Sequence, residues 1–129
     1  QRQQRFDAEI AWLEARVEEV RAEAARLGLS RGVQLIIRWH HEWWNGSGYP
    51  DCLENEQIPL AARLLRIADT YASLTAARPF RKSMSVEQAR RYLIEWAGIE
   101  FDPTVVKAFL TVADAAAARQ RASVAVESA

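Results

Sequence analysis

The segment "IPLAARLLRIADTYASL", residues 58–74, decides the fold class of this chain. Its apolar residues recur every three or four positions, which predicts an α-helix with two apolar stripes. Few positions remain for a solvent-facing side, namely Arg63, Arg66, Thr70 and Ser73. We therefore expect a central helix that begins near Ile58, with Pro59 at an N-terminal position where its missing N–H has little effect.

Asp69 is the one acidic residue of this segment, and it lies between Leu65 and Ala72 on one apolar stripe. The spacing predicts that its carboxylate is carried into the interior. An unpaired, ionised carboxylate in the interior is strongly unfavourable. Asp69 therefore needs a cation nearby.

Further helices are predicted on both sides of the central one. The apolar spacing after Ser30 indicates a helix through the histidines to about Trp44. Ser85 with Gln88 forms a capping box for a helix that ends at Gly98.

Asp102 and Pro103 then provide the N-cap and first position of a last helix. Its inward side is predicted to hold Val105, Val106, Phe109 and Val112. No alternating strand pattern is present, so the predicted class is all-α, a bundle of about five helices.

Residues 1–29 show a heptad pattern, with apolar residues at alternating steps of four and three. The seam consists of Phe6, Ile10, Leu13, Val17, Val20, Ala24 and Leu27. β-Branched residues at the first seam position favour a parallel two-stranded coiled coil, so we expect a homodimer. The alternative is a helix that packs against its own domain. The expected division is a coil over 1–29, a helical domain over 30–115, and a helix extension or frayed tail over 116–129.

The composition narrows the classes of partner. Lys and Arg together number 17, as do Asp and Glu, so no overall field favours DNA. No apolar run reaches the length of a membrane span. Cys52 is the single cysteine, which favours a reducing cytoplasm. The chain begins with Gln1 and not with Met, so we expect a fragment that an upstream domain precedes.

Both histidines of the chain lie in "HHEWWNGSGYP", residues 40–50. Together with the carboxylate of Asp69, the imidazoles of His40 and His41 suit Fe, Mn, Zn or Co. Adjacent histidines on a helix cannot both point at one atom, so they would reach two metals, or one metal and a second group. The alternative is an ordinary buried histidine pair held by hydrogen bonds.

The loop that follows combines Gly46 and Gly48 with the step from Tyr49 to Pro50. Two glycines let the backbone approach a ligand closely, while the proline restricts the tyrosine. Before this loop, Trp43 and Trp44 suit either stacking on a base or packing in the core.

The segment "ARPFRKS", residues 77–83, places Arg78, Arg81 and Lys82 within five residues. Guanidinium groups match phosphate oxygens through paired hydrogen bonds. The alternative is a charged surface segment in contact with water.

The string "HHEWWNGSGYPDCLENEQIPLAARLLRIADTYASLTAARPFRKSMSVEQA", followed by "FDPTVVKAFL", resembles the C-terminal half of the HD-GYP domain. That family comprises metal-dependent phosphodiesterases that hydrolyse cyclic di-GMP. The resemblance covers residues 39 to about 110. It implies that His40, His41 and Asp69 are metal ligands, that Gly48, Tyr49 and Pro50 form the signature loop, and that the basic cluster holds substrate phosphates.

The chain also departs from the family pattern. It has no histidine besides His40 and His41, so the His-Asp doublet and the other family histidines are missing. Asn45 and Ala72 stand where the family usually has Asp. We expect no metal, or one weakly held divalent ion (Fe, Mn or Zn), with Glu42 orienting an imidazole from the second shell. A full di-metal centre is not expected. Without a metal, a histidine would pair with Asp69 directly.

The resemblance and these departures together predict a degenerate, non-catalytic module of cyclic di-GMP signalling that acts as a dimer. Its partner is expected to be cyclic di-GMP, held by Tyr49, Arg78, Arg81 and Lys82, or a signalling protein such as a GGDEF cyclase. The alternative is a metal-dependent cyclic di-GMP phosphodiesterase whose missing half lies outside this chain.

Overall fold

The computed structural model describes residues 4, 8, 11, 15, 18, 19, 22, 23 and 25–128. Within them it holds four α-helices, α2 (Arg31–Trp39), α3 (Leu60–Thr75), α4 (Val86–Glu95) and α5 (Pro103–Ser128), and the short 3-10 helix η1 (Asn55–Gln57). No strand occurs among these residues, so the predicted all-α class is confirmed. The seam positions Ile10, Leu13, Val17 and Val20 lie outside the described residues, and Leu27 is exposed.

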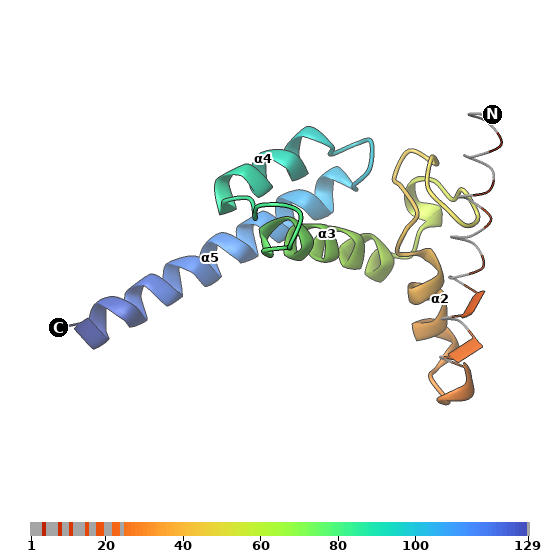
Figure 1. Cartoon of the computed structure of the whole chain (residues 1–129), viewed down its shortest axis with the longest axis horizontal. Helices are drawn as coiled ribbons and strands as arrows, with labels where there is room; N and C mark the ends of the chain where they lie inside the picture. The colour runs from red at the N-terminus through yellow and green to blue at the C-terminus, as the bar shows by residue number, and fades with distance from the viewer. Residues whose placement is uncertain are drawn as a thin grey trace.

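Helix α3 is central, as its apolar pattern predicts, because it contacts α2, α4 and α5 (Figure 1). The core lies where α3, α4 and α5 meet, and α2 contributes no buried residue to it. The buried members of this core are Ile67, Leu93, Phe101, Val105, Val106 and Leu110. The site described below lies along α3, between His41 after α2 and Ser73 near the end of α3.

The caps predicted at Ser85 and Asp102 are confirmed, and Ser30, near which a helix was predicted to begin, is a cap as well. The Ser30 hydroxyl accepts a hydrogen bond from the Val33 N–H, and Ser85 and Gln88 form the reciprocal capping box. The Asp102 carboxylate accepts from the N–H groups of Thr104 and Val105 at the start of α5. Each cap satisfies backbone donors that a helix start leaves without partners.

Two helices end earlier than predicted. Helix α2 stops at Trp39, so the histidines lie in the following turn and not on the helix. Helix α4 stops at Glu95. Gly98 then adopts a positive φ of 85° in the tight turn, where its N–H donates to the carbonyl of Phe101. The apolar spacing continues past the end of α2, and the end predicted for α4 rested on Gly98, which lies in the turn beyond that helix.

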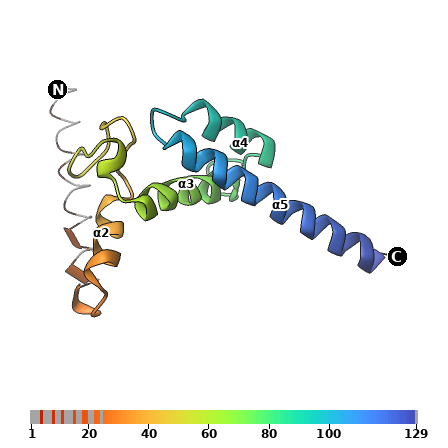
Figure 2. The ribbon, with the colours of Figure 1, turned by 180° about the vertical axis from the view of Figure 1, so that it is seen from behind.

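Helix α5 is the longest described helix, at 26 residues, and it runs to Ser128. Figure 2 shows from behind how its second half leaves the rest of the molecule. Val112, which we predicted to face inward, is 66% exposed, although α5 still contacts α4 two residues later through the ion pair between Arg90 and Asp114. No helix in the described part of the chain is long and apolar enough to cross a membrane.

The main difference from the sequence-based predictions is which side chains of α3 are buried and which are exposed. Asp69 is exposed, and so are Leu60 and Leu64 on the predicted apolar stripe. Arg63 and Arg66 are half-buried instead. They turn inward because each forms an ion pair with a carboxylate between α4 and α5, and because a long arginine stem packs well on apolar groups.

Replacement of Leu93 tests the position of the core. Leu93 is fully buried, whereas its neighbour Ile94 is 57% exposed. We expect Leu93→Ala to lower the free energy of unfolding by about 2–5 kcal/mol, since it leaves a cavity. The matched variant Ile94→Ala should stay within about 0.5 kcal/mol of the parent. Urea unfolding of both variants measures this, and equal losses would contradict the described core.

Candidate functional site

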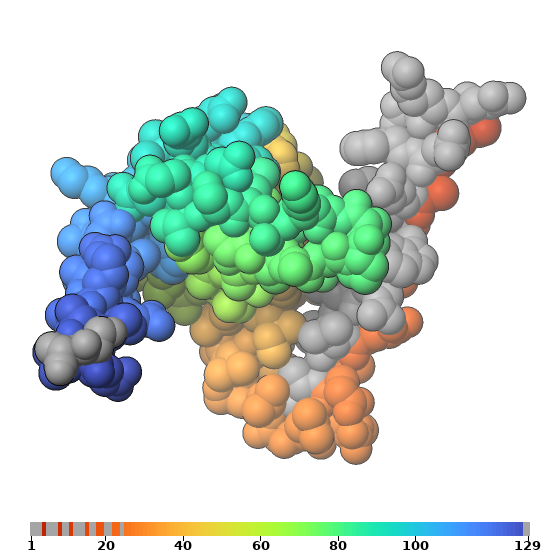
Figure 3. Space-filling model, turned by 60° about the vertical axis from the view of Figure 1, so that its left-hand side comes forward, coloured from red at the N-terminus to blue at the C-terminus, as the bar shows by residue number. Residues whose placement is uncertain are grey.

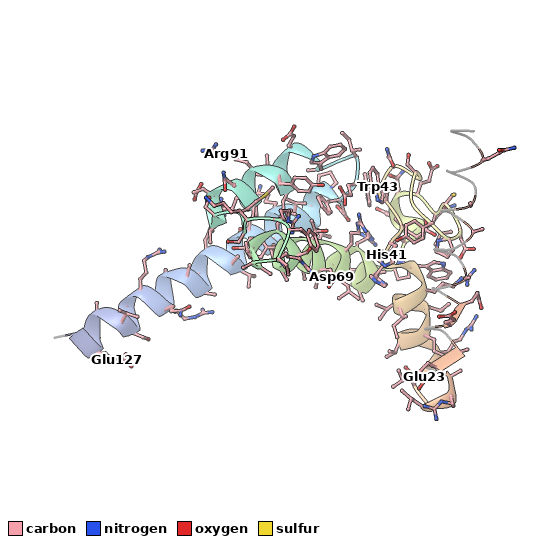
Figure 4. All side chains as sticks on the ribbon, in the orientation of Figure 1. Glu23, His41, Trp43, Asp69, Arg91 and Glu127 are labelled. Atoms are coloured by element: carbon pink, nitrogen blue, oxygen red, sulfur yellow. The ribbon has the colours of Figure 1, made fainter. Side chains whose placement is uncertain are left out.

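The two histidines lie at the junction between α2 and α3, where Figure 4 labels His41. The Nδ1 of His40 lies 2.6 Å from the carbonyl oxygen of Ile37. A carbonyl only accepts hydrogen bonds, so this nitrogen carries the proton. The ring centroids of His40 and His41 are 3.9 Å apart. The first histidine is thereby turned back onto α2, and the second faces α3.

Glu42 holds the loop that follows the histidines. Its carboxylate is buried and accepts hydrogen bonds from the N–H groups of Asp51, at 2.6 Å, and Leu53, at 3.0 Å. Burial raises the pKa of the carboxyl, and these backbone donors oppose that rise. The role expected for Glu42, orienting an imidazole, is not the one that the structure shows.

Gly48 is the tightest point of this loop. A Cβ at this position would lie 2.3 Å from the Trp43 nitrogen and 2.6 Å from the His41 carbonyl oxygen. Only glycine allows this approach of two backbone segments. The next residue, Tyr49, stacks on the His41 ring with a centroid distance of 5.1 Å. The signature loop thus covers one face of His41.

The remaining loop residues shape its ends. Gly46 adopts a positive φ of 88°, and Pro50 follows a cis peptide bond. Asn45, which stands where the family usually has Asp, still accepts a hydrogen bond from the Ser47 N–H through its side-chain oxygen. The turn geometry therefore survives this substitution.

Asp51 anchors the loop to α2. Its carboxylate accepts two hydrogen bonds from Arg38, at 2.9 and 3.0 Å, and one from the Trp39 indole, at 2.6 Å. The Arg38 guanidinium holds the pKa of the Asp51 carboxyl below its usual value. Arg38 also pairs with Glu18, so it joins two acidic partners far apart in the sequence.

Arg66 is a site residue that sequence reasoning missed. Its guanidinium forms an ion pair with Glu100 and lies 3.4 Å from the Nδ1 of His41. It also lies 5.9 Å from the ring centre of Trp43. Arg66 had been assigned to solvent because the sequence does not show that Glu100, 34 positions later, is its partner.

His41 is neutral near pH 7 in this environment. Burial lowers the pKa of its imidazole from 6.5 to about 4, and His40 and Arg66 add to the effect. The opposing charge of Asp69 raises it slightly. A neutral ring offers one nitrogen as donor and one as acceptor.

A pocket of about 310 Å³ opens beside His41 along α3. It is lined by His41, Arg66, Asp69, Thr70, Ser73, Leu74 and Glu100. The pocket thus brings together two of the three predicted metal ligands, His41 and Asp69, while His40 does not line it. Figure 4 shows Asp69 further along the same helix.

The basic segment after α3 contacts Ser73, which lines this pocket. Arg78 and Arg81 close a tight turn with Pro79 at its second position, where the fixed φ of proline favours a turn. Arg78 donates to the Ser73 hydroxyl at 3.3 Å, and Arg81 donates to the Ser73 carbonyl at 2.8 Å. Both predicted phosphate-binding arginines therefore contact a residue that lines the pocket, and neither is itself a lining residue.

The other members of the predicted ligand set make fewer contacts. Lys82 is exposed, and Phe80 at the tip of the turn is 85% exposed. Figure 3 shows this segment, in green, projecting from the surface beside α4. Trp43 packs edge-on against Trp96, and Trp44 lies under Arg63, so both tryptophans have packing roles.

The donor set of this pocket does not fit a metal ion held by this chain alone. Among the described residues, no group of three His, Cys, Asp or Glu side chains is placed to hold one. His40 directs its Nδ1 to the backbone, and the Nδ1 of His41 faces a guanidinium. A transition metal needs four to six donors, whereas this pocket offers His41 and Asp69 together with Glu100, which is already paired with Arg66.

Comparisons with known proteins agree with the resemblance seen in the sequence. A family model described as HD domain matches residues 2–105. The match includes most of the segment 1–29, which the heptad pattern assigned to a separate coil. A cyclic di-GMP phosphodiesterase of Vibrio cholerae is 46% identical over 77 residues, covering 60% of this chain and 16% of the relative. A cyclic di-GMP phosphodiesterase response regulator of Xanthomonas campestris is 45% identical over 76 residues, 59% of this chain and 20% of the relative.

A solved structure shows the same fold. It is a cyclic GMP-AMP specific phosphodiesterase of V. cholerae, with a TM-score of 0.64 and 26% identity. The alignment covers 73% of this chain and 21% of that one. The chain therefore spans about a fifth of the length of the relatives that it matches.

Gly48 provides a test of the loop geometry. We expect Gly48→Ala to lower the free energy of unfolding by about 1–3 kcal/mol, because the new methyl overlaps backbone atoms. Gly32→Ala is the matched control, since a Cβ at Gly32 meets nothing within 4 Å. In a helix this change should leave stability unchanged or raise it by about 0.5–1 kcal/mol. Denaturant unfolding compares the two, and a tolerated alanine at position 48 would contradict the described approach.

The depressed pKa of His41 predicts a pH dependence of stability. The unfolded chain takes up a proton near pH 6.5, whereas the folded ring does so only near pH 4. The contribution of His41 is therefore fully present above pH 6.5 and is lost as the pH falls toward 4. An NMR titration should place the midpoint of the His41 ring near 4. His41→Gln should remove this part of the pH dependence, and a midpoint near 6.5 would refute the burial.

Proposed function

Because the chain belongs to the HD-domain family, we propose that it acts in cyclic di-GMP signalling as a module that binds the nucleotide without cleaving it. The binding site is the pocket between His41 and Ser73. The observation that carries this proposal is the convergence of two arginines on one pocket-lining residue, Ser73. Phosphate groups are the natural partners of paired guanidinium groups.

The pocket and residues outside its lining together offer groups for each part of a cyclic dinucleotide. Arg78 and Arg81 supply positive charge for a phosphate at one end, and Thr70 and Ser73 supply hydroxyl groups. The exposed ring of Phe80 and the half-buried ring of Tyr49 provide aromatic faces for a guanine. Lys82, next to Arg81, adds a further cation for the phosphates.

The absence of cleavage is proposed from the donor set. Hydrolysis in this family uses metals that turn a bound water into a nucleophile. Among the described residues, the pocket gathers His41 and Asp69, while its other acidic residue, Glu100, is paired with Arg66, and the chain has no histidine besides His40 and His41. A metal held here by this chain alone would be weak, whether Fe, Mn or Zn.

The alternative function is phosphodiester hydrolysis with ligands from residues outside this chain. The relatives are phosphodiesterases, and the chain spans only about a fifth of their length. In that case His41 and Asp69 would form one side of a larger centre. Hydrolysis of cyclic di-GMP by a longer protein, but not by this chain, would favour the alternative.

Homodimerisation through the N-terminal heptads remains a proposal, as does docking of a GGDEF-type or other signalling protein on the signature loop. Leu27, the one large seam residue that the structure describes, is 62% exposed and thus available to a second copy. Sedimentation of the purified chain decides between monomer and dimer. A cytoplasmic setting, favoured by the single free Cys52, is likewise a proposal.

Calorimetric titration with cyclic di-GMP tests the proposed function. We expect binding, and we expect Arg78→Ala to weaken it about 10- to 100-fold, as the loss of a charged hydrogen bond implies. Arg91→Ala is the matched control, because Arg91 is exposed on α4, away from His41 and Asp69 (Figure 4). It should leave the affinity unchanged.

Product analysis of the same samples separates the two functions. Intact nucleotide after long incubation with Mn²⁺ supports a binding module, whereas linear or mononucleotide products would overturn it. No binding by the parent chain would refute the nucleotide site itself. Equal weakening by Arg78→Ala and Arg91→Ala would show that only general charge matters.

A further inference from the structure

We propose that the guanidinium of Arg66 takes the place of a metal cation in this site, as a fixed positive charge held between the Glu100 carboxylate and the Nδ1 of His41. Arg66 is then a positioning residue that sets the orientation and tautomer of His41. The inference concerns the same pocket as the proposed function, and it rests on that proposed function.

Glu100 is a buried acidic residue beside His41 in the pocket. Its side chain is only 5% exposed, and a buried carboxylate needs a cation close by. Arg66, itself 18% exposed, provides that cation through a direct ion pair. The Tyr92 hydroxyl lies 3.4 Å from the second carboxylate oxygen. Within the described part of the chain, Arg66 is the cation paired with Glu100.

Arg66 also contacts the imidazole of His41. An arginine has only hydrogen-bond donors, so the Nδ1 of His41, 3.4 Å from the Arg66 Nη1, has to accept. The proton of the neutral ring therefore lies on Nε2. A metal cation bound at Nδ1 would require the same unprotonated nitrogen. The guanidinium thus contacts Nδ1, the ring nitrogen that such a cation would bind.

The side chain of Arg66 is held in a fixed position by its surroundings. Its Nε is buried and has no hydrogen-bond partner, and its guanidinium lies against the Trp43 ring. Leaving a donor unpaired is unfavourable, so this placement is maintained by the ion pair and by packing. The side chain has little freedom to leave and admit a metal.

The two histidines are therefore predicted to be opposite tautomers. His40 carries its proton on Nδ1, which faces the Ile37 carbonyl. His41 carries its proton on Nε2, because its Nδ1 faces Arg66. This difference gives a direct readout that a purely structural role of Arg66 would not produce.

Removal of the guanidinium should convert the site into a cation site. We expect Arg66→Met to bind Mn²⁺ at least about tenfold more tightly than the parent chain, because it leaves a buried carboxylate without its cation beside His41 and Asp69. Titration with MnCl₂ alone, without nucleotide, measures this. Nucleotide binding is not involved, so this inference and the proposed function can fail separately.

Arg63→Met is the matched control. Arg63 lies one turn earlier on α3 and pairs with Asp102, which is also 5% exposed, but the described contacts of this pair include no histidine. We expect no gain of Mn²⁺ affinity in this variant. A gain in both variants would mean that any freed carboxylate suffices, and it would overturn the inference. Tight Mn²⁺ binding by the parent, or no gain in Arg66→Met, would also overturn it.

Histidine tautomers in the parent chain give a second test that needs no variant of Arg66 to fold. Long-range proton-nitrogen NMR spectra of chelator-treated protein at pH 7.5 distinguish the two forms, and His40→Gln assigns the signals. We expect a protonated Nε2 on His41 and a protonated Nδ1 on His40. A protonated Nδ1 on His41 would refute the contact with Arg66.

Discussion

The ion pair between Arg66 and Glu100 is the interaction on which the arrangement of the site depends. Glu100 belongs to the connection between α4 and α5, and Arg66 belongs to α3. The backbone of the same connection accepts hydrogen bonds from Trp44 and Asn45, through the carbonyls of Glu100 and Ile99. Three segments that are distant in sequence therefore meet at Glu100. These contacts fix the position of His41.

Electrostatics explain why this pocket differs from the di-metal centre that the family resemblance implies. The Arg66 charge and the Glu100 charge neutralise each other, and the neutral His41 adds none, so Asp69 remains as an exposed carboxylate. Arg78 and Arg81, which contact Ser73 beside the pocket, are the cations that the proposed phosphate site uses. Arg66 and this pair of arginines thus have different roles in the proposed site.

Local signals in the sequence predicted much of the fold. Ser30, Ser85 and Asp102 cap helices as expected, because a cap depends only on residues within one turn. The exposure of Asp69 and the burial of Arg66 were not predictable in this way. The burial of Arg66 depends on Glu100, and that of Arg63 on Asp102, and these partners lie 34 and 39 positions away in the sequence, which hides the pairing. The HD-domain resemblance was confirmed, since its motifs are contiguous in the chain.

Arg38 connects the signature loop to Glu18, a residue that does not line the pocket. One guanidinium serves both Asp51 in the loop and Glu18 near the start of the chain. Asp51 and its neighbour Leu53 in turn contact the buried Glu42, directly after His41. Arg38 therefore links Glu18, through Asp51 and Glu42, to the turn that carries His41. A change at Glu18 would leave one Arg38 donor without its acidic partner while the two hydrogen bonds to Asp51 remain.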